Sequence, residues 1–251
     1  MEMSRLDFFA SCRRWYAAAN PAGPAPTMTT STSSVSCSAM GNENPPAEVE
    51  KLYWQKADGS DKPELLVDMA RAPESWSSQD QLLSFITRKV GATLDYDIWT
   101  YSLRDKKAKP LIDTPTSAQH SSRFSPDGKW MAYASDESGE FGVYVQPFPV
   151  TGAKYKISKK PGSLHPVWSP DGRQLYFDDQ QRMYSVEIRT QPSFQASEPV
   201  AMPISGFIAG GVNTRRQWDM TPDGKQFIMV FQKQEIQNIS KWADDVRSRV
   251  K

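Results

Sequence analysis

The sequence predicts an all-β fold, a β-propeller of four-stranded antiparallel blades, because a turn motif and an apolar run recur together along the chain. The motif Ser-Pro-Asp-Gly occurs at Ser125–Gly128 and Ser169–Gly172, with a variant at Thr221–Gly224 and a degenerate copy at Ser77–Asp80. An aromatic or large apolar residue precedes each copy, and an apolar run follows it. The copies start 48, 44 and 52 residues apart, and a period in the forties is typical of a propeller blade.

Each residue of the turn motif has a structural reason. Proline suits the second position of a tight turn, aspartate accepts hydrogen bonds from nearby backbone N–H groups, and glycine takes the positive φ that returns the chain into an antiparallel strand. These aspartates could also serve as metal ligands or acid–base groups, but turn formation explains them better. We therefore assign turn roles to Pro126, Asp127, Gly128, Pro170, Asp171, Gly172, Pro222, Asp223 and Gly224.

The repeat region starts with half a blade. Residues 52–55 and 64–67 predict an outer hairpin with no inner strands before it. The strands of the first whole blade are expected near Trp76 and at 82–87, 97–103 and 110–112.

The second and third blades are clearer, and a fourth begins but stops after two strands. In the second blade, Met131 and Tyr133 face one side and Ala132 the other, so both faces are apolar, as packing between two neighbours requires. The expected strands are 122–124, 130–134, 142–147 and 154–158, then 167–168, 174–177, 183–188 and 199–202, and finally 218–220 and 226–231.

This number of blades predicts an incomplete ring. About four blade units are recognisable if the first hairpin is counted with the last two strands. A closed ring of four blades would turn about 90° per blade and would crowd Trp76, Phe124 and Trp168 at a narrow axis. We therefore expect an open arc whose bare blade faces are covered by further sequence or by another copy.

Composition divides the chain into three parts, with the propeller blades at 51–232. Residues 1–50 are rich in Pro, Ala, Ser and Thr, so we expect disorder there. In the last part, 233–251, apolar residues recur every three or four positions, which favours a helix, although 238–242 could begin as a short strand.

Charge and composition exclude several classes of function. A net charge of +1 gives no basic face for nucleic acid. No apolar run is long enough for a membrane span, and the stretch 13–19 is too short for the apolar core of a signal peptide. Cys12 and Cys37 both lie in the N-terminal part and carry little information on redox environment.

No catalytic residue, metal site or cofactor is predicted. The chain has no Gly-x-Ser-x-Gly motif, and Gly206 and Gly210–Gly211 do not have dinucleotide-binding spacing. His120 and His165 are the two histidines and are not spaced as metal ligands.

The residues with the best claim to bind a partner lie where the inner strands begin. Alignment on the turn motif puts Pro73, Ser121, His165 and Gln217 at equivalent positions, near the expected mouth of the central channel. They are the candidates for contacts with a protein or a small ligand, together with their neighbours, although ordinary polar rim residues would look the same. The candidate set is His120, Ser121, His165, Arg215, Arg216 and Gln217.

The repeat at 124–133, Phe-Ser-Pro-Asp-Gly-Lys-Trp-Met-Ala-Tyr, resembles those of TolB-like, WD-repeat-like bacterial β-propellers. The phrase at 143–149 and the ending at 242–246 are similar to propellers fused C-terminally to serine/threonine protein kinases. This resemblance implies an extracytoplasmic sensing or protein-binding module of about six or seven blades. The chain carries no kinase motif and about four blades, so no kinase residue is transferred, and a fragment or a gene that has lost its front half is expected.

Two classes of function remain open. The first is a non-catalytic propeller that binds a protein or senses a ligand. The second is the accessory propeller of a prolyl-oligopeptidase-like hydrolase, against which the missing nucleophile motif counts.

Overall fold

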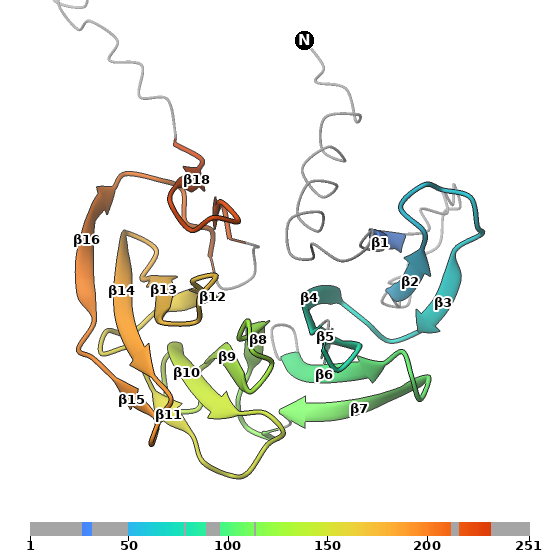
Figure 1. Ribbon diagram of the computed structural model, residues 1–251, viewed down its shortest axis with the longest axis horizontal. Helices are drawn as coiled ribbons and strands as arrows, with labels where there is room; N and C mark the ends of the chain where they lie inside the picture. Colours follow the sequence, from blue (N-terminus) through green and yellow to red (C-terminus); the bar gives the residue numbers. More distant parts are fainter. Residues whose placement is uncertain are drawn as a thin grey trace, which may run out of the picture.

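A computed structural model describes residues 27–31, 50–77, 79–88, 96–112, 114–211 and 216–231. Throughout these residues the secondary structure is β, arranged as a series of antiparallel sheets around an arc (Figure 1). The predicted C-terminal helix at 233–251 lies outside the described residues, as does Arg215. No helix in the described ranges has the length and apolar character needed to cross a membrane.

The first sheet contains three strands, β1 (Thr27–Ser31), β2 (Lys51–Gln55) and β3 (Glu64–Val67), in the order β1-β2-β3. Strands β2 and β3 form the outer hairpin that the sequence predicts. Strand β1 lies within the segment expected to be disordered, and at these five residues the structure differs from that expectation. Three of the five are threonine, a β-branched residue that favours strands, and all five pair with β2. The rest of 1–49 lies outside the described residues.

Three whole blades follow, each with consecutive strands side by side. Blade 1 consists of β4 (Ala72–Ser77), β5 (Leu82–Arg88), β6 (Tyr96–Ser102) and β7 (Lys107–Ile112). Blade 2 consists of β8 (Gln119–Phe124), β9 (Trp130–Ser135), β10 (Gly142–Pro147) and β11 (Tyr155–Lys156). Blade 3 consists of β12 (Leu164–Trp168), β13 (Gln174–Asp178), β14 (Arg182–Arg189) and β16 (Val200–Ser205), with β15 (Gln195–Ala196) also pairing with β14.

The last described unit is a two-stranded sheet, called here the terminal hairpin: β17 (Trp218–Met220) and β18 (Phe227–Met229). The described strands stop there, and the ring is left open between the terminal hairpin and the first sheet (Figure 1). This is the open arc that the number of blades predicts.

The core consists of apolar layers between successive blades, because the second strand of a blade has apolar residues on both faces. In blade 2, Met131 and Tyr133 pack with Ile98 of blade 1. Ala132 points the other way and packs with Leu175 and Phe177 of blade 3. Each blade is therefore held by the next one in the chain, as both apolar faces require.

The turn motifs stack from blade to blade along one side of the arc. Gly128, Gly172 and Gly224 have φ values of 69°, 70° and 71°, in the left-handed region that favours glycine. A Cβ added at Gly172 would lie 3.6 Å from Cδ of Pro126, and one added at Gly224 would lie 3.0 Å from Cδ of Pro170. The proline of one turn thus lies against the glycine of the next.

The motif aspartates are bound within their own turns. Asp127 Oδ1 accepts hydrogen bonds from Ser125 Oγ at 2.6 Å and from Lys129 N at 3.0 Å. The other two turns repeat this arrangement, and their hydroxyl and backbone donors hold the pKa of Asp171 and of Asp223 below the usual range. These carboxylates stabilise the turns.

Candidate functional site

The inner strands of all three blades carry a bulge close to the axis of the arc. Their pairing with the second strand shifts register between Pro73 and Ser75, between His120 and Arg123, and between Leu164 and Val167. In blades 2 and 3 the bulge contains a non-glycine residue with positive φ, 59° at Ser121 and 55° at His165. Such conformations cost energy and persist only where surrounding contacts hold them.

In blade 2 those contacts come from Glu74 of blade 1. Its carboxylate accepts hydrogen bonds from the backbone N–H groups of Ser121 and Ser122, the latter at 2.6 Å, and from Ser122 Oγ. Arg123 donates back to the carbonyl oxygen of Glu74. Burial raises the pKa of the Glu74 carboxyl and outweighs the lowering by Ser122 and Arg123. Glu74 therefore joins blade 1 to the bulge of blade 2.

His120 lies beside this bulge and is buried, with 5% of its surface exposed. Its Nδ1 lies 2.9 Å from Ser121 Oγ, and its ring packs on Phe141 with 4.9 Å between ring centroids. Nε2 has no hydrogen-bond partner among the described residues. Burial, with a smaller effect of His165, lowers the pKa of His120 to about 3, so the imidazole is neutral at physiological pH.

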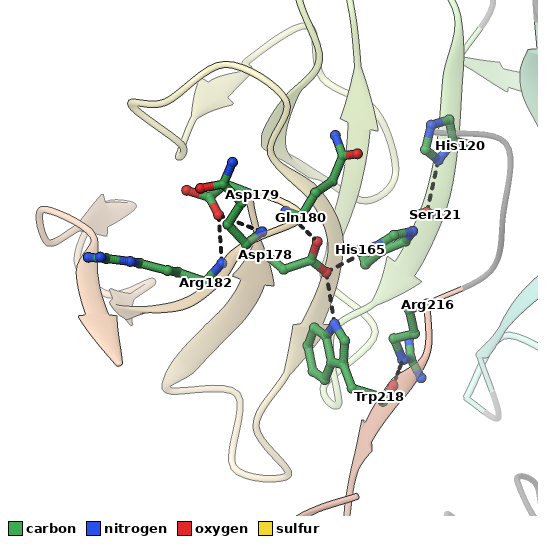
Figure 2. Close-up of polar contacts among 10 residues, drawn as sticks. His120, Ser121, His165, Asp178, Asp179, Gln180, Arg182, Arg216 and Trp218 are labelled. Atoms are coloured by element: carbon green, nitrogen blue, oxygen red, sulfur yellow. Dashed lines mark hydrogen bonds and ion pairs between the residues drawn. The ribbon is translucent and has the colours of Figure 1, made fainter. Parts of the chain in front are cut away.

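The bulge of blade 3 is tied to the terminal hairpin through Asp178. Figure 2 shows His165 and Trp218 converging on this carboxylate. Asp178 Oδ2 lies 2.9 Å from His165 Nδ1 and accepts a 2.8 Å hydrogen bond from Trp218 Nε1. Asp178 Oδ1 accepts a third hydrogen bond, from Gln180 N. Asp178, His165 and Trp218 are all buried, and their polar atoms are paired with one another, as buried polar groups usually are.

Arg216 lies beside Trp218 (Figure 2). Its Nε donates to the carbonyl oxygen of Trp218 at 2.7 Å, and its Nη2 lies 3.0 Å from Asp219 Oδ1. The guanidinium also lies over the Trp218 ring, 5.6 Å from its centroid. Burial, and secondarily the charge of Arg123, lowers the pKa of Arg216. Gln217, the next residue, is exposed.

The structure thus gathers His120, Ser121, His165 and Arg216 along the inner edge of the arc (Figure 2). Sequence reasoning missed the three residues that hold them: Glu74, Asp178 and Trp218. A carboxylate one position after Pro73 was a usable signal for Glu74. Asp178, by contrast, ends a second strand, and the sequence does not show that it reaches the inner edge.

The chemistry available at this edge is limited. The contact between Ser121 Oγ and His120 Nδ1 resembles a nucleophile beside its base, but an imidazole with a pKa near 3 is a weak base at neutral pH. The described residues also contain no group of three or more His, Cys, Asp or Glu side chains that could hold a metal ion.

Comparison with known proteins gives matches by structure. No family model and no curated protein matches the sequence. A protein assigned as TolB from Agrobacterium tumefaciens matches over 74% of this chain and 66% of its own, with a TM-score of 0.52 and 14% identity.

Two further matches are more distant. TolB from Acinetobacter baumannii covers 73% of this chain and 49% of its own, with a TM-score of 0.46 and 17% identity. An oligogalacturonate lyase from Vibrio parahaemolyticus covers 72% of this chain and 51% of its own, with a TM-score of 0.48 and 14% identity. The chain therefore spans one half to two thirds of the length of these proteins. At such low identity the likeness concerns the fold, and the fold is that of a TolB-like β-propeller with an open ring.

Proposed function

We propose that this chain is a non-catalytic propeller module that binds a protein or a small ligand at the inner edge of its arc. The residues that would contact the partner are His120, Ser121, His165, Arg216 and Gln217, with Arg215, which lies outside the described residues. The observation that carries the proposal is His120 Nε2, a buried polar atom without a partner in the described structure. Such an atom costs about 1–3 kcal/mol when it stays unpaired, and a donor or acceptor of a ligand would relieve this.

The way in which the carboxylates are used supports binding rather than catalysis. Glu74 accepts hydrogen bonds from three groups of blade 2, and Asp178 accepts them from blade 3 and the terminal hairpin. A general acid or base must be able to exchange its proton with a substrate. These groups are instead committed to holding blades together. The further proposal of a kinase-linked sensor rests on the sequence resemblance alone.

A thermal-shift screen with two defined panels, short peptides and simple sugars, tests the proposal. A ligand present at about one hundred times its Kd stabilises the folded state by about 2.7 kcal/mol. We expect the shift to disappear in His120→Phe, which keeps the packing on Phe141 but lacks Nε2. The control Gln181→Ala, at an exposed position of blade 3, should respond as the wild type does.

Mass spectrometry of the recovered ligand then separates binding from catalysis. An unchanged ligand supports a binding module, whereas conversion to a product would contradict the non-catalytic proposal. If a ligand stabilised His120→Phe as much as the wild type, the ligand would bind somewhere other than at His120.

A further inference from the structure

The two ends of the arc present bare blade faces of complementary kinds. Each blade has a forward face, turned toward the next blade in the chain, and a backward face, turned toward the preceding blade. In each complete contact, a forward face packs on the backward face of the next blade. The terminal hairpin is the last described unit and has a bare forward face. In the first sheet, the β2–β3 hairpin has a backward face on which Leu65 is 46% exposed.

The forward face of the terminal hairpin is identified by alternation along its strands. Trp218, Met220, Phe227 and Met229 pack against blade 3. Since side chains alternate along a strand, Ile228 points to the opposite face, where Asp219 is its cross-strand partner. Ile228 is 65% exposed.

Equivalent positions in the other blades show that this exposure is abnormal for the repeat. Alignment of the inner-strand pairing places Ile228 with Ser84, Ala132 and Tyr176. Those three side chains are 0%, 0% and 9% exposed, because a following blade covers each of them. Val230, two residues after Ile228, is also bare, at 47% exposed.

The backward face of the first sheet shows the matching feature. Leu52 and Val67 pack against blade 1, and Trp54 contacts Trp76 there. On the opposite face Tyr53 and Leu65 form a cross-strand pair, and Leu65 is 46% exposed. Cross-strand pairs of this kind interact side by side, so Tyr53 and Leu65 form one apolar surface on this face.

We propose that a second copy of this chain covers these faces, with the first sheet of one copy packed on the terminal hairpin of another. The partner is a second copy because the chain itself supplies a bare apolar backward face that matches its bare forward face. A net charge of +1 leaves little electrostatic repulsion between copies. The contact is heterologous, so two or more copies close into a ring or continue as an open chain.

Light scattering and sedimentation of the full chain over a roughly hundredfold concentration range test this association. We expect the mass to rise above the 28.3 kDa of one chain as the concentration increases. Ile228→Asp and Leu65→Asp should each weaken association at least about tenfold, which is equivalent to about 1.4 kcal/mol. Val200→Asp is the matched control, since Val200 is 62% exposed but lies on β16 of blade 3, which belongs to neither the first sheet nor the terminal hairpin.

A mixing experiment tests the pairing of the two faces. Ile228→Asp keeps the backward face intact, and Leu65→Asp keeps the forward face intact. The two variants together should therefore form a one-to-one complex that does not grow further, although each alone stays monomeric. Val230→Asp serves as a second forward-face variant if Ile228→Asp fails to fold, as judged by circular dichroism.

Three outcomes would overturn the proposal. One is a wild-type chain that stays monomeric over the whole range. In that case, binding of a dye for apolar surfaces that appears only after removal of residues 232–251 would mean that the chain's own tail covers the two faces. The second is an equal effect of Ile228→Asp and Val200→Asp on the mass. The third is failure of the two folded, monomeric variants to pair when mixed.

Discussion

Blade 3 and the terminal hairpin are built from the same repeat, yet their second strands lie in different surroundings. In β13, Phe177 is covered by blade 2 and Tyr176 by the terminal hairpin. In β18, Met229 is covered by blade 3, while Ile228 on the other face is bare. Both strands are apolar on both faces. The comparison teaches that burial in this fold is conferred by the neighbouring blade and is not a property of the strand itself.

The largest expected effect comes from truncating the equivalent residues Phe177 and Met229. Phe177 is 1% exposed and stacks on Tyr184, so Phe177→Ala should destabilise the fold by about 3–5 kcal/mol. Met229 is only half-buried, and Met229→Ala should cost roughly half as much or less. Urea unfolding, monitored by tryptophan fluorescence, gives the free energy of unfolding of both variants. Equal losses would mean that the terminal hairpin is as well covered as blade 3.

Next in size is removal of the polar link between these two regions. Asp178→Ala would leave His165, Trp218 Nε1 and Gln180 N without their acceptor, which should cost about 3 kcal/mol. Amide exchange should show the loss mainly in β17. The control Asp105→Ala, in the exposed turn after β6, should change stability by less than about 1 kcal/mol. Unchanged protection of β17 in Asp178→Ala would contradict the link.

The turn glycines give a smaller effect that tests the junction between units. Gly172→Val and Gly224→Val each force a β-branched residue to positive φ, which costs about 1–3 kcal/mol. Gly224→Val should be the worse of the two, because its Cβ would approach Pro170 to 3.0 Å. The control Lys129→Val should have little effect on the melting temperature. Similar shifts for all three variants would be inconsistent with the turn assignment.

The smallest effect at neutral pH concerns His120. Its pKa is about 3 in the folded chain and near 6.5 when unfolded, so between these values the unfolded chain binds more protons. Stability is therefore full above pH 6.5 and falls as the pH drops toward 3. His120→Phe should unfold with a flatter pH dependence in this window. At pH 7 the change should be small, because the variant loses the contact of Nδ1 with Ser121 Oγ as well as the cost of the unpaired Nε2. If the stability of the variant changed with pH as steeply as that of the wild type, His120 would not be the cause of this pH dependence.

The strands and turns were predictable because their signals are local. Alternation in residues 130–134 and the turn at Gly128 act within a few residues, and the structure places β9 and its turn accordingly. The bulges at Ser121 and His165 could not be predicted, because they depend on Glu74 and Asp178, which lie on other strands. His120 and His165 were selected by position alone, and their burial depends on how the blades meet. The strand at Thr27–Ser31 was missed because composition outweighed its threonine content.

The stacked turns have a consequence for how such a chain changes length. Pro126 lies against Gly172 and Pro170 against Gly224, so both sides of each junction come from the same four-residue motif. A tandem duplication of one repeat therefore carries with it both halves of a new junction, and a deletion removes both. Genes for such chains can therefore gain or lose a repeat and keep the proline–glycine contact between the turns that remain.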